Sequence, residues 1–156
     1  MSKSLARVRR AIEDLGLNVH VLHVTVPTNT ARQAADVVGC AVDQIAKSVI
    51  FRGEASGEAI LFLTAGGNRV DIAKASALAG EALGKADAAL IREQTGFAIG
   101  GVSPFGHLNP IRAFMDPRLL EFDLIWAAAG TPHHLFDIAP KVLVDKTGAR
   151  VADFTG

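Results

Sequence analysis

The chain has 156 residues, with 16 basic and 16 acidic side chains, so its length is typical of one domain and no net charge attracts it to nucleic acid or a membrane surface. A polyanionic partner must therefore meet a local cluster of cations. The single cysteine, Cys40, excludes a disulfide within this chain and suits a reducing compartment. No run approaches the roughly 18 apolar residues of a membrane span, and the basic start lacks an apolar signal core. We expect residues 1–156 to form one cytoplasmic domain without a membrane partner.

The first part of the chain predicts two helices with a strand between them. Glycines at 16 and 39 end the helical patterns, Pro27 ends the strand, and the polar run before Ala31 supplies capping side chains. The arginines of the first helix are either a solvated face or an edge for RNA phosphates. The predicted elements are a helix over 5–15, a strand over 18–26, a helix over 31–38, and a connection with one helical turn over 40–46.

The middle of the chain begins with a lysine at the head of a strand. Alternation places Lys47 on the same side as Val49 and Phe51, so an ammonium group heads an apolar face. Such a lysine either extends to the rim or points into a cleft. The predicted elements here are a strand over 47–51, a hairpin loop over 53–57, a strand over 59–63 that is covered on both faces, and a helix over 72–79 capped by Asp71.

The last part of the chain mixes helices and strands without strict alternation. Its predicted elements are a helix over 87–94 ended by Gly96, strands over 111–115, 122–128 and 134–138, a helix over 140–146, and an edge strand over 151–154. This order indicates an α/β (α+β) fold in which helices surround a mixed sheet, rather than a doubly wound parallel sheet.

Glycines, a proline, a hydroxyl group and an imidazole come together in the segment 100–107, Gly-Gly-Val-Ser-Pro-Phe-Gly-His, which we call the glycine loop and expect between two apolar strands. Adjacent glycines allow positive φ angles and close approach to another body, and Pro104 stiffens the return path. Such a loop can present free backbone NH groups to a developing oxyanion, a carboxylate or a phosphate. The alternative is a tight structural turn.

Several common motifs are missing. There is no Walker loop and no glycine fingerprint between a strand and a helix, so we expect no nucleotide cofactor. The few histidines lack carboxylates at ligand spacing, so we expect no metal. Cys40 could be a nucleophile, but no base lies near it in the sequence, and a small buried hydrophobe is the alternative. Ser103 lacks the Gly-x-Ser-x-Gly elbow.

Three stretches together resemble the YbaK/EbsC family, the freestanding relatives of the editing domain inserted in bacterial prolyl-tRNA synthetase. They are Ile45-Ala46-Lys47-Ser48-Val49-Ile50-Phe51, Arg69-Val70-Asp71-Ile72-Ala73-Lys74 and Gly100-Gly101-Val102-Ser103-Pro104-Phe105-Gly106. The resemblance extends over nearly the whole chain and implies a partly barrel-like editing-domain fold.

What the resemblance implies is trans-editing, the hydrolysis of the ester that joins a wrong amino acid to the 3′-terminal adenosine of a tRNA. The expected substrate is tRNA for proline that carries a small residue such as alanine, cysteine, serine or threonine. Lys47 matches the family's functional lysine, and Gly100, Gly101, Ser103 and Pro104 belong to its Gly-x-x-x-Pro loop. An aminoacyl ester is already activated, so positioning, a water and NH donors suffice. In the family, the terminal ribose hydroxyl of the substrate is thought to help activate that water.

Further residues are expected around this centre. We expect the tRNA to contact Lys47, Arg69 and Lys74, and the rest of the substrate to contact Thr30, Val49, Val102, Phe105, His107, His133 and His134. Of His133 and His134, strand parity lets only one face the pocket. We favour His134, and the alternative is that both are exposed turn residues. His107 is either a pocket wall or a surface group.

Three functions remain open at this point. The first is an aminoacyl-tRNA deacylase, with prolyl-tRNA synthetase as a candidate partner and no DNA partner. The second is a module of the same fold that binds aminoacyl-tRNA or RNA ends without hydrolysis. The third is a hydrolase of small amino-acid esters or amides, which would lack the steep salt dependence of phosphate contacts.

Overall fold

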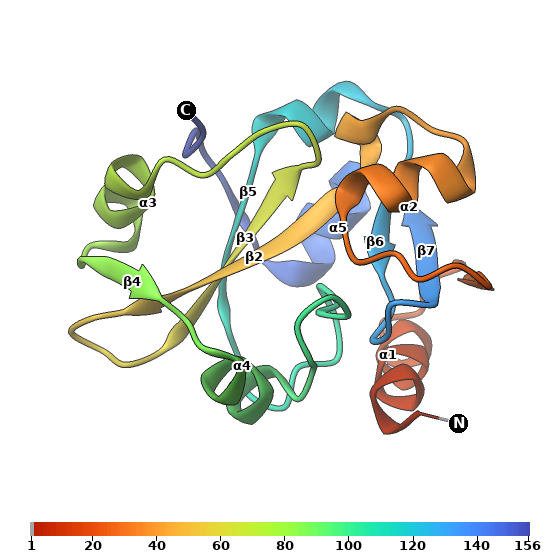
Figure 1. The fold of residues 1–156 in the computed structure, drawn as a ribbon, viewed down its shortest axis with the longest axis horizontal. Helices are drawn as coiled ribbons and strands as arrows, with labels where there is room; N and C mark the ends of the chain where they lie inside the picture. Colours follow the sequence, from red (N-terminus) through yellow and green to blue (C-terminus); the bar gives the residue numbers. More distant parts are fainter. Residues whose placement is uncertain (1) are drawn as a thin grey trace.

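The computed structural model describes residues 2–156 and arranges their strands in two sheets (Figure 1). A five-stranded mixed sheet has the order β4-β2-β3-β5-β8, and a three-stranded antiparallel sheet has the order β1-β7-β6. The predicted mixed sheet with surrounding helices is confirmed. The strands are β1 (Val21–His23), β2 (Ala46–Gly53), β3 (Ala59–Ala65), β4 (Leu83–Lys85), β5 (Arg112–Met115), β6 (Ile125–Ala128), β7 (His134–Ile138) and β8 (Arg150–Val151).

The helices begin and end close to the predicted residues because their caps are local. Thr30 accepts a hydrogen bond from the Gln33 NH, Gln33 bonds back to the Thr30 NH, and Gly39 ends that helix in the left-handed region. The helices are α1 (Lys3–Asp14), α2 (Ala31–Val38), α3 (Ile72–Ala79), α4 (Ala88–Thr95) and α5 (Pro140–Thr147), with 3₁₀ turns η1 (Val42–Gln44) and η2 (Pro117–Glu121). None of the helices formed by residues 2–156 has both the length and the apolar character that crossing a bilayer requires.

Strand β3 lies at the centre of the larger sheet, and all of its residues are buried, as its continuous apolar run predicts. It pairs antiparallel with β2 and parallel with β5. Ile60 and Phe62 pack against α3, whereas Leu61 and Leu63 join the main core together with residues of α1, α4 and α5. Alternation along one strand therefore separates two hydrophobic clusters.

The three-stranded sheet closes the other side of the main core, to which it contributes Ile125, Phe136 and Ile138. A parallel bridge between Ile45 and Trp126 joins the two sheets, and within residues 2–156 they do not close into a full barrel.

The strands differ most from the predicted bounds. The strand predicted over 18–26 is only Val21–His23, because Val24 and Thr28 donate backbone hydrogen bonds to the turn that precedes β7 instead of continuing a ladder. The strand over 122–128 begins at Ile125, and the edge strand over 151–154 is reduced to Arg150–Val151. Strand β4 was not predicted, because a three-residue strand with a glycine at its centre lacks alternation.

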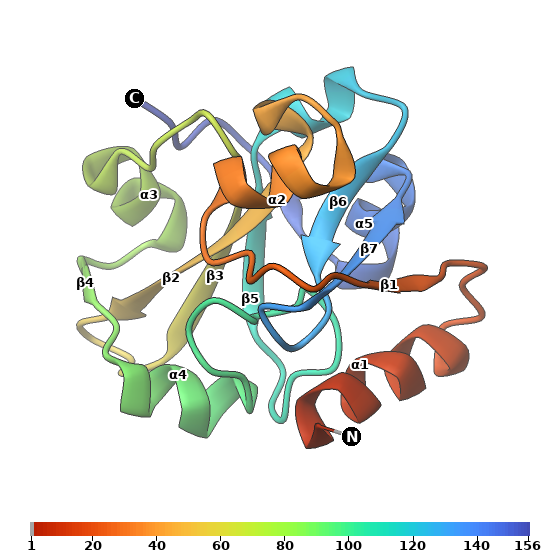
Figure 2. The same ribbon diagram turned by 45° about the vertical axis from the view of Figure 1, so that its right-hand side comes forward.

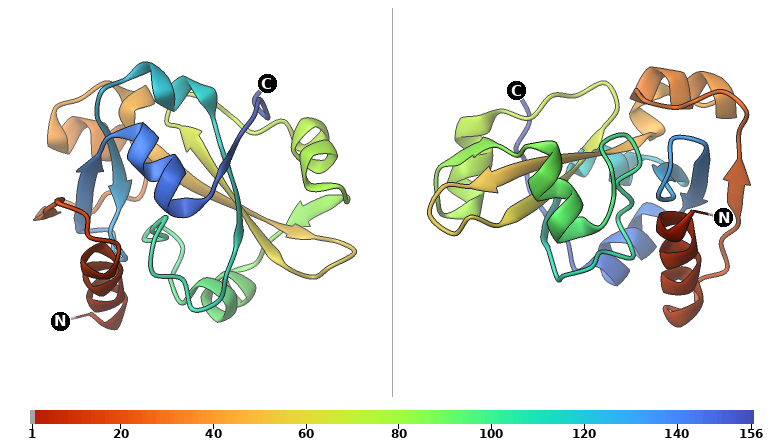
Figure 3. Two further views of the ribbon diagram at one scale, coloured as in Figure 1. Left: turned by 180° about the vertical axis from the view of Figure 1, so that it is seen from behind. Right: turned by 60° about the horizontal axis from the view of Figure 1, so that its bottom comes forward.

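The prediction that the glycine loop lies between two strands is wrong, because the loop connects helix α4 to strand β5. Figures 2 and 3 show this segment passing between α4 and α1. One side of the loop reaches the region where α2 and β2 begin, which places it beside the pocket described next.

Candidate active site

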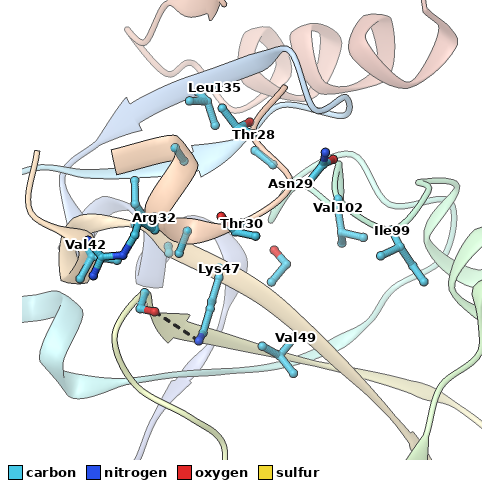
Figure 4. Close-up of a pocket in the computed structure, with 18 of the residues that line it drawn as sticks. Thr28, Asn29, Thr30, Arg32, Val42, Lys47, Val49, Ile99, Val102 and Leu135 are labelled. Carbon is cyan, nitrogen blue, oxygen red and sulfur yellow. Dashed lines mark hydrogen bonds between the residues drawn. The ribbon is translucent and has the colours of Figure 1, made fainter. Parts of the chain in front are cut away.

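A pocket of about 530 Å³ lies between the N-terminal end of α2, the first residues of β2 and the glycine loop (Figure 4). The loop after β3 and residues of β6 and β7 complete its lining. Five of the predicted site residues line this pocket: Thr30, Lys47, Val49, Gly100 and Val102. The fold thus brings together residues from widely separated parts of the chain.

Lys47 is half-buried and points across the pocket floor, where its Nζ donates a hydrogen bond of 3.3 Å to the Gly66 carbonyl. Val49 and Phe51 pack against the cluster beneath α3, while Ile50 packs against the main core, so the predicted alternation holds along β2. Of the two alternatives for Lys47, the structure shows a side chain that points into a cleft and does not extend to the rim.

The surroundings of Lys47 lower its pKa below the ordinary value. Burial is the largest cause, and the positive charge of Arg69 adds to it, while Asp43 and Asp116 act in the opposite direction. Among residues 2–156, no carboxylate lies within ion-pair distance of Nζ. An anion that entered the pocket would favour the charged form, so the site is suited to a phosphate or a developing oxyanion.

In the glycine loop, the two adjacent glycines meet different steric demands. Gly100 has a φ of 92°, which only glycine adopts readily, whereas a Cβ on Gly101 would lie 2.8 Å from the Gly130 carbonyl oxygen. The Gly101 NH donates to the Ala98 carbonyl at 3.1 Å. Within residues 2–156, the NH groups of Gly100 and Val102 have no acceptor, so two of the predicted free donors belong to residues that line the pocket.

The remaining loop residues lie behind this surface. Ser103 is fully buried and its Oγ accepts a hydrogen bond from the Phe105 NH. Pro104 is buried, and Phe105 is a core residue that stacks on Phe136. None of the three lines the pocket, so the structure places them as supports of the loop and not as groups that reach a substrate there.

The structure places the three predicted histidines outside this pocket. Leu135 lines it, so His134, the preceding residue of β7, points to the opposite face, where its ring lies 4.9 Å from that of His23. His133 is in the turn, and its Nδ1 lies 3.0 Å from the Val24 carbonyl oxygen. His107 lines a separate groove of about 510 Å³.

The two predicted tRNA-binding residues beyond Lys47 differ in their partners. Arg69 is exposed, close enough to Lys47 to affect its pKa, and has no ion-pair partner in the described chain. Lys74 instead binds Asp153 at 3.2 Å and the Thr155 carbonyl at 2.8 Å. Only Arg69 is therefore free to meet a phosphate.

The family model for the aminoacyl-tRNA editing domain matches residues 25–146, most of the chain and all of the pocket lining. The chain belongs to the aminoacyl-tRNA editing domain family. The resemblance found in the sequence is thereby confirmed.

Three relatives of this editing domain match nearly their full lengths. The chain is similar to the crystal structure of a proposed trans-editing enzyme for prolyl-tRNA synthetase, with 46% identity and a TM-score of 0.93 over 100% of this chain and 99% of that one. It is similar to hypothetical protein APE2540, with 31% identity and a TM-score of 0.89 over 96% and 99% of the two chains. It is also 30% identical to the uncharacterized protein YwhH of Bacillus subtilis (strain 168), over 95% of this chain and 94% of that protein.

Four polar residues that line the pocket of the editing domain were not predicted as site residues: Thr28, Asn29, Arg32 and Ser48. Arg32 lies on its rim, and Asn29 faces the glycine loop, where a Cβ on Gly100 would be 3.3 Å from the Asn29 Oδ1 (Figure 4). The run Thr28-Asn29-Thr30 was the sequence signal for further pocket residues, because it offers three side chains that can cap a helix, whereas one N-cap residue is enough. In the part of the chain that the structure describes, no group of three His, Cys, Asp or Glu side chains could hold a metal ion.

Proposed function

We propose that this editing domain hydrolyses the ester bond of a mischarged aminoacyl-tRNA. The observation that carries the proposal is that Lys47 lines one pocket together with Gly100 and Val102, whose NH groups have no acceptor among residues 2–156. The described lining of this pocket contains no Asp, Glu, His or Cys, so it offers no carboxylate, imidazole or thiol as a general base or nucleophile. An aminoacyl ester needs neither, because its carbonyl carbon is already open to attack by a positioned water.

In the proposed reaction, water adds to the ester carbonyl and the terminal ribose hydroxyl of the substrate helps to remove its proton. The carbonyl oxygen becomes an oxyanion, which the NH groups of Gly100 and Val102 would stabilise. The bond from the carbonyl carbon to the ribose oxygen then breaks, and that oxygen takes up a proton. The products are the free amino acid and a tRNA with both terminal hydroxyl groups restored.

The cations at the pocket support binding of the tRNA 3′ end. Lys47 lies inside, and Arg32 and Arg69 are exposed beside it without ion-pair partners among residues 2–156. Lysine binds phosphate as a point charge, and arginine can bind two phosphate oxygens at once. We propose that these three side chains hold the terminal phosphates, while the ester lies between Lys47 and the glycine loop.

The apolar part of the pocket supports a small amino acid as the acyl group of the ester. Val49, Val102 and Leu135 come from different elements and narrow the space around the loop. A synthetase separates side chains that differ by one methylene by only about 1–3 kcal/mol, so a second, smaller pocket adds accuracy. We propose alanine, cysteine, serine or threonine on tRNA for proline. The choice of this tRNA agrees with the description of the relative that is 46% identical, which names prolyl-tRNA synthetase.

The decisive experiment is single-turnover deacylation of tRNA for proline charged with alanine, cysteine, serine, threonine or proline. We expect hydrolysis of one or two of the small residues, with proline spared, and a loss of about 100-fold or more in Lys47→Ala. Lys85→Ala, which removes an exposed lysine of β4 outside the pocket, is the matched control and should retain full activity. Tight binding of the charged tRNA without hydrolysis would instead support the binding module.

A further inference from the structure

An arginine of α1 bridges the two ends of the segment that contains the glycine loop. The Arg7 Nη2 donates to the Gly96 carbonyl at 2.6 Å, and its Nε donates to the Gly106 carbonyl at 3.2 Å. The guanidinium carbon also lies 4.8 Å from the centre of the Phe97 ring. Arg7 is half-buried, whereas its neighbours Arg9 and Arg10 are exposed, so it is not part of a simple solvated face.

A histidine holds the same loop from within. The His107 Nε2 lies 2.7 Å from the Ser103 carbonyl oxygen, and since a carbonyl only accepts, this nitrogen carries the proton and donates. The His107 ring meets Phe97 edge to face at 5.7 Å. Burial, and to a lesser degree the charge of Arg7, lower the pKa of His107, which favours the neutral ring.

Packing also supports the loop, because residues 101–105 are buried and Phe105 stacks on Phe136 in the main core. Its own hydrogen bonds are few, with Gly101 bonded to Ala98 and Phe105 bonded to the Ser103 hydroxyl. Gly100 has a positive φ angle, a backbone conformation that residues other than glycine rarely adopt. The anchors at Gly96, Ser103 and Gly106 therefore add hydrogen bonds to a segment that has few of its own, and they help to hold the NH groups of Gly100 and Val102 in place.

We infer that Arg7 and His107 are positioning residues that orient the glycine loop toward the scissile carbonyl, an inference that rests on the proposed deacylase function. Neither lines the pocket, so neither touches the substrate there. Helix α1 lies before the matched residues 25–146, so the family match does not include this contact. In the free protein the loop would already hold the shape that the oxyanion needs.

The test compares Arg7→Lys and His107→Leu with the wild type in single-turnover deacylation at saturating charged tRNA. Lysine keeps the charge but cannot bridge both carbonyls, and leucine removes the donor. We expect the rate to fall about tenfold to a hundredfold, because a misplaced loop loses oxyanion stabilisation, while the tRNA dissociation constant changes by less than about twofold. His107→Gln, which returns an NH donor, should restore part of the rate.

A second measurement separates positioning from general stability. The amide NMR signals of Gly100 and Val102 should shift in Arg7→Lys and remain in place in Ile12→Val, which only trims a buried methylene from the same helix. Ile12→Val should also retain the wild-type rate. An equal loss of rate in Ile12→Val, or unchanged amides and rates in the Arg7 and His107 variants, would overturn the inference.

The wild type distinguishes failure of the inference from failure of the proposed function. A wild type that hydrolyses no charged tRNA would reject the proposed function, and the positioning role with it. An active wild type whose Arg7 and His107 variants are equally active would reject the positioning role alone.

Discussion

Gly100 and Gly101 have different roles in the loop. Gly100 supplies the positive φ, and its missing side chain leaves room beside Asn29. Gly101 supplies close contact with the backbone of Gly130 and Thr131, atoms that no rotamer change can move away. An adjacent pair of glycines can therefore combine a strained conformation and a tight packing contact, and the two demands can be told apart only in three dimensions.

Lys47, at its half-buried position in the pocket, should reduce the stability of the folded protein. Its pKa is lowered, so between its folded pKa and the ordinary value of 10.5 the unfolded state binds more protons than the folded state. Wild-type stability should therefore rise with pH through this window. We predict that Lys47→Met raises the melting temperature at pH 7 by a few degrees, and that this advantage shrinks as the pH approaches 10.5. Thermal unfolding from pH 7 to 10.5 measures this, with Lys85→Met, at an exposed position of β4, as the control for the loss of a lysine.

The N-terminus of α2 is an element with two functions. Thr30 caps the helix through a reciprocal pair of hydrogen bonds with Gln33, and the same residue lines the pocket. The geometry of this cap therefore sets the positions of Asn29 and Arg32 at the pocket.

We predict that Thr30→Ala lowers the free energy of unfolding by about 1 kcal/mol and also weakens the binding of charged tRNA. Asp87→Ala, which removes the cap of α4 away from the pocket, should lose similar stability with no change in binding. Chemical denaturation and tRNA titration measure the two effects. Equal binding by both variants would show that the α2 cap is only structural.

Across the whole molecule the charge is balanced, and the free cations at the pocket are few. If Arg32, Lys47 and Arg69 are the phosphate contacts, at most three counterions are released, and the slope of log K against log salt should lie near −2. We predict that Arg32→Ala and Arg69→Ala each make this slope shallower by about 0.7, whereas Lys141→Ala, at an exposed position of α5 outside the pocket lining, leaves it unchanged. Binding titrations over a salt range of about 50 to 300 mM test this prediction. A slope that is unchanged in both arginine variants would place the tRNA elsewhere.

Local chemistry allowed much of the fold to be predicted from the sequence. Helix α2 and helix α3 have the predicted bounds because a capping side chain and a glycine mark their ends. Period-two alternation along β2 correctly placed Lys47 with Val49 and Phe51. Short strands such as β4 carry no such signal, since their existence depends on a partner strand.

The candidate site also has a part that could be predicted from the sequence and a part that could not. Lys47 and the glycine loop could be chosen from the sequence because residue type and spacing limit what they can do. Which side chains surround them could not. His134 lies in β7 on the face opposite Leu135, and His133 lies in the preceding turn. Arg7 meets Gly96 and Gly106 across 89 and 99 residues of the chain. Spacing within a segment governs local conformation, whereas contacts between distant segments depend on how the two sheets and α1 enclose the core. The sequence therefore predicted which residues form the centre of the candidate site, and the packing of the folded chain determined which residues surround and support them.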